Sequence, residues 1–198
     1  RVPLLMSDII YREITAADMA AVIDLANEVH GDNYLNEDSF QQYLAGGTAG
    51  NVQLNWIALR GDTPLGIRIT LAPGQWPIDD FCTPDAWPIP ADKLCYFKCA
   101  AVSEKARGLG IGKELLYRSI ASAKELGCQG GLAHIWMQSP KNSAYEYFTR
   151  CGGEMIKQHE KRWYKASVED GYYCPVCDGT CYCDAGEMLL KFDTQGSE

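Results

Sequence analysis

The sequence lacks the features that define several common classes of protein. No apolar run approaches the ~18 residues that span a bilayer, so a membrane protein is not expected. The first residues, Arg1 to Met6, are too short for a secretory signal and lack its cleavage pattern, which favours a cytoplasmic protein. Basic residues are few, because 18 Lys and Arg stand against 26 Asp and Glu, for a formal net charge of -8. Surfaces that bind nucleic acid are usually basic, so such a partner is not expected either.

What is present is a globular composition. Of the 198 residues, 46% are hydrophobic, which is enough to bury one core and excludes a disordered chain. The length fits one domain, with or without a small appendage. Hydrophobic periodicity predicts a mixed α/β domain without internal repeats. Strands are expected at 8–14, 52–59, 65–71, 93–102, 131–137, 155–164 and 187–192, and helices after Asp18, over 36–44, from a glycine-rich turn to Gly127, and over 143–151.

Residues 73–92 are predicted to form an inserted loop rich in Trp and Pro. Five prolines and two tryptophans in this stretch oppose a long regular element. A loop of this length in a compact domain is usually functional or flexible. The alternative is a surface loop that its tryptophans anchor over the core, and both interpretations stay open.

A glycine-rich turn carries the strongest functional signal. Gly108, Gly110 and Gly112 alternate between a predicted strand and an amphipathic helix. Glycine removes side chains from the approach to the helix N-terminus, where unpaired N–H groups and the helix dipole can bind a diphosphate. The Walker pattern fails because Glu114 follows Lys113 where Ser or Thr is needed, and the Rossmann pattern fails on glycine spacing. The alternative is a glycine-rich corner without a ligand.

The segment Arg107-Gly108-Leu109-Gly110-Ile111-Gly112 resembles the acyl-CoA-binding motif of the GNAT acetyltransferase superfamily, Gln/Arg-x-x-Gly-x-Gly/Ala. It matches at all three specified positions, and the element order over residues 8–165 also resembles that of the family. The resemblance implies one GNAT-like domain over 1–198, with a mixed central sheet of six to seven strands flanked by about four helices.

The same resemblance implies how acetyl-CoA is bound. The amides of 107–112 would wrap the diphosphate, and the end of the preceding strand would pair with the pantetheine arm. That strand would splay from 133–137 and leave a wedge for the thioester. The cofactor-binding residues so implied are Ala101, Val102, Arg107, Gly108, Leu109, Gly110, Ile111, Gly112, Lys113 and Asn142.

The second motif of the family is matched less well. In the family, a later helix reads Asn-x-x-Ala, then Tyr, then Gly-Phe, and its Tyr commonly protonates the departing thiolate. Here Phe148 or Thr149 occupies the Tyr position, depending on the register. Tyr145 and Tyr147 lie nearby on different sides of the predicted helix. Each is a candidate catalytic residue, and the alternative role is aromatic packing on the sheet.

The general base is not marked by the family pattern. Attack of an amine on a thioester needs a group or a water chain that removes a proton, but strand 93–100 carries no acid. His134 is a candidate catalytic base because histidine titrates near neutral pH, although a strand histidine can also be purely structural. Positioning without a base is a further alternative. The acidic candidates are Asp79, Asp80, Asp85, Asp92, Glu28 and Glu37.

Nine cysteines fall into two groups. Five are scattered and are interpreted as small buried apolar residues: Cys82, Cys95, Cys99, Cys128 and Cys151. The other four form a C-x2-C-x3-C-x-C cluster inside a Cys-rich insertion over 166–184: Cys174, Cys177, Cys181 and Cys183. This spacing predicts a structural tetrahedral zinc site, in which His159 is an alternative ligand. The other interpretation is reduced thiols without metal, since an odd count and no secretory signal argue against disulfides.

These features predict an acetyl-CoA-dependent N-acetyltransferase in which a primary amine attacks the thioester directly. The acidic charge favours a cationic small molecule or peptide amine as acceptor. The alternative is a non-catalytic acyl-CoA-binding or zinc-stabilised interaction module on the same fold. A homodimer is left open beside the monomer.

Overall fold

The structure is a computed structural model that describes residues 8–193. The N-terminal residues on which the expected absence of a secretory signal depends lie outside this range. No helix within 8–193 is both long and apolar enough to cross a membrane. The helices are α1 Met19–His30, α2 Glu37–Gly46, α3 Ile111–Glu125, α4 Ser143–Arg150 and α5 Tyr164–Glu169. The strands are β1 Ile10–Glu13, β2 Thr48–Ala49, β3 Val52–Gln53, β4 Trp56–Arg60, β5 Thr63–Leu71, β6 Leu94–Val102, β7 Gly130–Trp136, β8 Glu154–His159 and β9 Ala185–Lys191.

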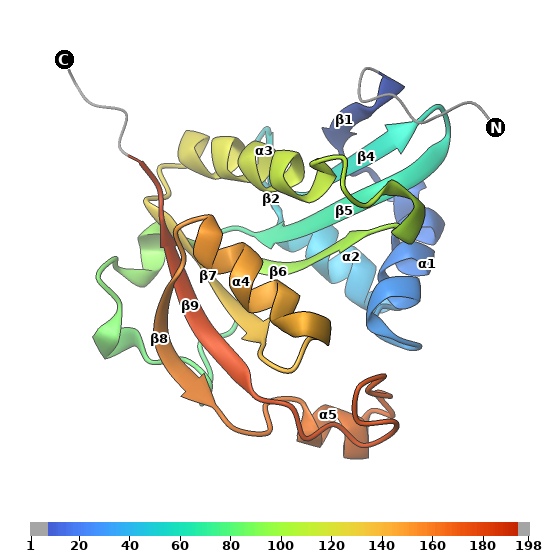
Figure 1. Ribbon diagram of the computed structural model, residues 1–198. Coiled ribbons are helices and arrows are strands. Elements are labelled where there is room, and N and C mark those ends of the chain that lie inside the picture. Colours follow the sequence, from blue (N-terminus) through green and yellow to red (C-terminus); the bar gives the residue numbers. More distant parts are fainter. Residues whose placement is uncertain (1–7, 194–198) are drawn as a thin grey trace. The chain divides into compact units, whose positions relative to one another are not determined.

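Seven strands are hydrogen-bonded in the order β1-β4-β5-β6-β7-β9-β8, and β2 and β3 form a separate hairpin (Figure 1). This arrangement confirms the predicted mixed α/β class. The chain divides into two compact units that share β6. The first comprises Arg1–Ala72 and Lys98–Leu126, and the second comprises Pro73–Phe97 and Gly127–Glu198, each described within 8–193.

In the first unit, antiparallel strands β1, β4 and β5 carry α3 on one side and α1 and α2 on the other (Figure 1). Helix α3 packs closely because Gly66 has no side chain, and a Cβ there would lie 2.8 Å from Ile111 Cγ2. Ile111 and Leu115 are buried in this contact, and each contributes roughly 1.5–3 kcal/mol of hydrophobic stabilisation. The packing therefore fixes the end of α3 that follows the glycine-rich turn.

In the second unit, β7 lies between β6 and β9. It runs parallel to β6, with pairs from Leu94↔Gly130 to Tyr96↔Leu132, and antiparallel to β9, which pairs in turn with β8. One face packs against α4, where Phe97 meets Phe148 edge-on at a ring distance of 6.1 Å. The opposite face carries Tyr96 and His134, because successive strand residues alternate between the faces.

The loop 73–92 is anchored by both of its tryptophans. Trp76 and Trp87 are buried, and their indole N–H groups donate to the Leu94 carbonyl at 3.2 Å and to Glu187 Oε2 at 2.6 Å. Trp76 also stacks on Tyr96, with ring centroids 5.2 Å apart. The loop is therefore fixed to the strand face that carries His134.

The segment after β8 departs from prediction. The strand expected over 155–164 ends at His159, and Tyr164–Glu169 forms helix α5. The chain turns at Lys161, which has φ 50° and whose N–H donates to Asp184 Oδ1 at 3.1 Å. A backbone with positive φ cannot continue a strand, so the expected strand is cut short.

The strand expected over 52–59 is also divided, into β3 and β4. The buried side chain of Asn55 lies at the break. It donates to the Tyr43 carbonyl at 2.9 Å and accepts the Thr70 N–H at 2.7 Å. These bonds replace part of the ladder that a continuous strand would have made.

Candidate functional site

The glycine-rich turn connects β6 to α3 within the first unit. After Val102 the chain makes one 3-10 turn over Glu104–Ala106, and Gly110 is the N-cap residue of α3. Gly108 has φ 82° and Gly110 has φ 74°, in the left-handed region that favours glycine. A Cβ added at either position would meet nothing within 4 Å. The turn therefore leaves open space in front of the helix N-terminus.

This open turn fits a diphosphate. The first-turn N–H groups of α3, from Ile111 to Lys113, have no acceptor within the helix. A Cβ at Gly112 would meet Val102 Cγ2 at 3.7 Å, an ordinary van der Waals contact. Arg107 and Lys113 are exposed and add positive charge beside the helix dipole. Leu109 instead packs on the apolar cluster under α3, which holds the loop in place.

The end of β6 is also positioned by a hydrogen bond. His30 Nε2, from α1, lies 2.7 Å from the Ala100 carbonyl oxygen. Burial lowers the pKa of His30, so its imidazole is neutral near pH 7 and donates its Nε2–H to this carbonyl. Ala101 is buried and Val102 half-buried at the strand end, where the pantetheine contact was predicted.

His134 is held in a hydrogen-bonded chain on the loop-covered face of the second unit. Its Nε2 lies 2.5 Å from the Phe81 carbonyl oxygen, and its Nδ1 lies 2.6 Å from the Tyr96 hydroxyl. A carbonyl only accepts, so Nε2 carries the proton and Nδ1 accepts from Tyr96. In this tautomer the Tyr96 hydroxyl donates its proton to the imidazole Nδ1.

The charge state of His134 follows from its surroundings. Burial lowers the pKa of His134, and the positive charge of Arg162 acts in the same direction. The Phe81 carbonyl and the negative charges of Glu187 and Asp79 oppose this shift without cancelling it. His134 is therefore neutral near pH 7 and can accept a proton, which is what a general base requires.

Glu187 on β9 is directly opposite His134 in the β7–β9 ladder and was missed by sequence reasoning. Its carboxylate is fully buried and accepts bonds from the Thr83 N–H and hydroxyl, both at 2.8 Å, and from Trp87 Nε1. His159 Nε2 lies 2.9 Å from the same carboxylate. Burial acts to raise the pKa of Glu187, but these hydrogen bonds outweigh it and hold the pKa below its ordinary value. An ionised carboxylate thus fixes loop 73–92 beside His134.

The acidic residues considered as bases are on the surface. All six are exposed: Glu28, Glu37, Asp79, Asp80, Asp85 and Asp92. Asp79 Oδ1 accepts the Phe81 N–H at 2.9 Å and its Oδ2 lies 3.9 Å from Arg162. His134, by contrast, is half-buried and held by a hydrogen bond at each ring nitrogen.

Asn142 is the N-cap residue of α4, and the two candidate tyrosines lie in the helix. Lys141 and Asn142 have φ 59° and 55°, two successive non-glycine residues in the left-handed region. Such strain costs of order 1–3 kcal/mol per residue and concentrates at functional sites. Tyr145 and Tyr147 are both half-buried, and two residues of a helix separate them by about 200°, on different sides of α4. The helix therefore presents at most one of them to any one ligand.

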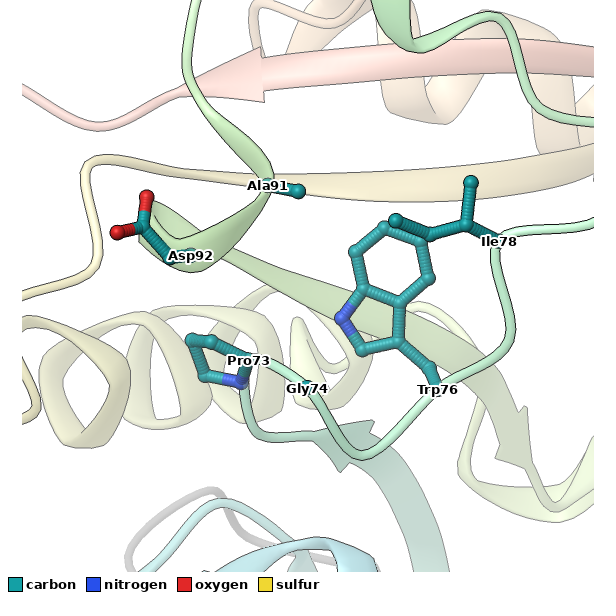
Figure 2. Close-up of a pocket in the computed structure, with 6 residues that line it drawn as sticks. All are labelled: Pro73, Gly74, Trp76, Ile78, Ala91 and Asp92. Atoms are coloured by element: carbon teal, nitrogen blue, oxygen red, sulfur yellow. The ribbon is translucent and has the colours of Figure 1, made fainter.

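Two of the cavities in the described part of the second unit lie close to loop 73–92. One, of about 350 Å³, surrounds the Trp76 ring, with Pro73, Ile78 and Ala91 around it and Asp92 pointing away (Figure 2). Asp92 is its only titratable lining group, so we interpret this cavity as packing space around the anchored indole. The other, of about 470 Å³, lies between Phe81 and α5 and has a charged lining of Lys161, Arg162, Lys165, Glu169 and Asp170.

The four clustered cysteines lie together after α5. Their Sγ atoms are all within 4.8 Å of one another, and they could hold a metal ion. His159 is not part of this group, and its Nε2 lies 2.9 Å from Glu187 Oε1 instead. Of the scattered cysteines, Cys95, Cys99 and Cys128 are buried as predicted, whereas Cys82 and Cys151 are only half-buried.

A seven-stranded mixed sheet with a glycine-rich strand-turn-helix unit is the fold of acyl-CoA-dependent acyltransferases. Sequence comparison agrees, since residues 19–153 match the model of the acetyltransferase (GNAT) family. The match covers more than half of the chain, and the chain belongs to this family. The predicted enzyme class, an acetyltransferase, is thereby confirmed. No curated protein matches the sequence.

Solved structures share the fold at low sequence identity. The ribosomal-protein-alanine N-acetyltransferase from Brucella melitensis has a TM-score of 0.64 and 16% identity, over 92% of this chain and 99% of that one. The yncA protein of Salmonella typhimurium, solved with its cofactor acetyl-CoA, gives 0.66 and 16%, over 96% and 97%. Naa50 of Arabidopsis thaliana, in complex with the bisubstrate analogue CoA-Ac-MVNAL, gives 0.63 and 15%, over 93% and 99%.

Proposed function

We propose that this acetyltransferase moves the acetyl group of acetyl-CoA to a primary amine by direct attack in a ternary complex. The observation that carries the proposal is the turn before α3. Its positive-φ glycines, Gly108 and Gly110, leave the helix N-terminus open to a diphosphate. In the proposal, amides of residues 107–112 hold the diphosphate, Ala101 and Val102 contact the pantetheine arm beside the predicted wedge, and Asn142 completes the cofactor site.

His134 acts as the general base in this proposal. The amine nitrogen attacks the thioester carbonyl carbon, and its excess proton must leave for a neutral amide to form. We assign that proton to the Tyr96–His134 pair. The phenol oxygen takes the proton of the amine while the phenol proton moves to Nδ1, 2.6 Å away. The imidazolium that forms keeps its bond to the Phe81 carbonyl and lies opposite the Glu187 carboxylate in the strand ladder.

A tyrosine of α4 protonates the departing thiolate in this proposal. The carbon–sulfur bond breaks as the tetrahedral intermediate collapses, and the sulfur takes a proton from a phenol. Tyr147 and Tyr145 are the candidates, and their positions on different sides of α4 mean that only one can serve. Replacing each by Phe distinguishes them, because the true acid loses kcat while the other variant retains it.

Direct attack is favoured over a covalent acetyl-enzyme. Cys99 is the cysteine closest in sequence to the end of β6, and it is buried. Burial raises the pKa of Cys99, so the thiolate that a ping-pong mechanism needs is disfavoured. Initial-rate kinetics should therefore give intersecting lines rather than parallel ones.

We propose a cationic small molecule or peptide amine as the acceptor. The net charge of -8 supports this class, because it raises the local concentration of cations. The cavity beside α5 has a mixed lining, with Lys161 and Arg162 on one hand and Glu169 and Asp170 on the other. An acceptor panel should therefore include polyamines, lysine-like amines, neutral amines and short peptides with free N-termini, the last because Naa50 of Arabidopsis thaliana was solved with a peptide-derived analogue.

Calorimetric titration with acetyl-CoA, followed by a thiol-release assay over this panel, tests the proposal. We expect binding and amine-dependent release of CoA. Binding without turnover on any amine would favour the non-catalytic acyl-CoA-binding module. Absence of binding would contradict the assignment of the turn.

A further inference from the structure

The four clustered cysteines have the geometry of a tetrahedral site. Cys177 Sγ and Cys174 Sγ lie 3.6 and 3.9 Å from Cys183 Sγ, and all four sulfurs are within 4.8 Å of one another. A disulfide needs a separation of about 2.05 Å, and these sulfurs are unbonded. A tetrahedron with Zn–S bonds of about 2.3 Å has an edge of about 3.8 Å. The two sulfur separations therefore fit a shared metal ion.

The backbone around the cluster donates to its sulfurs. The Cys177 N–H donates to Cys174 Sγ at 3.4 Å, and the Tyr182 N–H donates to Cys177 Sγ at 3.5 Å. Cys174 and Gly179 exchange backbone hydrogen bonds of 2.9 and 3.2 Å and close the turn between them. These hydrogen bonds fix the Cys174 and Cys177 sulfurs within the turn.

The surroundings favour a metal over four free thiols. Cys174, Cys181 and Cys183 are buried, and the rings of Trp136, Trp163 and Tyr172 pack around them. Four sulfur atoms brought together among aromatic rings form a donor set that would hold a bound cation. Four sulfur ligands without an open position select zinc as a closed, structural site, with iron as the competitor.

We propose that Cys174, Cys177, Cys181 and Cys183 bind one structural Zn²⁺. The ion fixes the connection between β8 and β9, because the cluster is tied to both sides of it. The Cys181 N–H donates to Ser167 Oγ of α5 at 2.9 Å, and the Cys183 carbonyl accepts the Arg162 N–H at 3.0 Å. Helix α5 has only six residues, too few to be stable alone in water.

The proposed zinc site is separate from the proposed acetyl-CoA site. All four ligands belong to the second unit, whereas the glycine-rich turn belongs to the first. Metal removal should therefore loosen residues 160–184 and the α5 wall of the cavity beside Phe81. Binding of acetyl-CoA at the turn should persist. Failure of the zinc proposal would leave the proposed binding of acetyl-CoA untouched, and the reverse also holds.

Metal analysis of the purified full chain, prepared without chelator, tests the proposal. We expect about one equivalent of zinc per chain, released stoichiometrically when an organomercurial blocks the thiols. Replacement by Co²⁺ should give the intense sulfur-to-metal charge-transfer bands of a tetrahedral thiolate site. Less than about a tenth of an equivalent of metal, with no such bands after reconstitution, would overturn the proposal. Iron in place of zinc would overturn the identity of the ion.

Variants separate the site from general folding. Cys177→Ser should lose most of the zinc, since it removes the half-buried ligand with the least damage to packing. Cys151→Ser, at a half-buried cysteine outside the cluster, should keep the full equivalent. Hydrogen exchange on the metal-depleted wild-type chain should rise over 160–184 and stay unchanged over 107–125. Equal zinc in both variants, or unchanged exchange over 160–184, would contradict the role given to the ion.

Discussion

Replacing Gly110 by Ala tests the diphosphate assignment most sharply. The position has φ 74°, where an L-residue costs roughly 1–2 kcal/mol, and no atom lies within 4 Å to add a clash. At about 2–4 °C per kcal/mol for a chain of this size, the Tm should fall by about 2–8 °C. The new Cβ enters the space before the first-turn N–H groups. Loss of one hydrogen bond to a charged oxygen costs about 1.5–3 kcal/mol, which weakens acetyl-CoA binding about 10- to 150-fold.

Gly127→Ala is the matched control for this change. Gly127 follows the other end of α3, with φ 82° and likewise nothing within 4 Å of an added Cβ. Its Tm should fall by a similar amount, while the Kd for acetyl-CoA measured by calorimetry should stay at the wild-type value. Wild-type affinity in Gly110→Ala, or an equal loss of affinity in both variants, would refute the reasoning.

Three further changes test the rest of the account. His134→Gln should lower kcat at pH 7. In the wild type, kcat/KM should fall only below pH 6.5, because burial lowers the pKa of His134, and the variant should lose this acidic limb. An unchanged pH profile would exclude His134 as the base. Glu187→Gln should cost about 3 kcal/mol in chemical denaturation because buried donors lose a charged acceptor, whereas the exposed Glu154→Gln should be neutral. Since the pKa of Glu187 is lowered on folding, its contribution should be present above pH 4.5 and lost in acid, and equal stability of the two variants would refute this anchor. Gly66→Ala should destabilise by about 1–3 kcal/mol, because its Cβ would lie 2.8 Å from Ile111 Cγ2; a wild-type melting curve would contradict the close packing of α3.

The parts of the site that could be predicted are those formed by residues close together in the sequence. Gly108 and Gly110 stand where positive φ is required, so the turn could be located from the sequence alone. The cysteine cluster is similar, since all four cysteines come from one short segment. In both cases the chemistry depends on residues close together in the chain.

The parts that could not be predicted depend on strand register. Tyr96 of β6 contacts His134 of the neighbouring strand β7. The sequence does not show which residues of the two strands are paired, so this contact could not be predicted. Glu187 left one weak signal, a single acidic residue in a largely apolar strand, but its four hydrogen bonds come from a distant loop and from β8. Helix α5 was missed because the turn at Lys161 depends on Asp184, far along the chain.

The central claim, direct acetyl transfer to an amine, is tested most directly by product stoichiometry. Acetyl-CoA, the enzyme and the best acceptor of the panel should be incubated together, with the released thiol and the acetylated amine both quantified by mass spectrometry. The account predicts equal amounts of the two products and no acetylated enzyme. Thiol release without acetylated amine, or an acetyl group that accumulates on a cysteine of the chain, would contradict it.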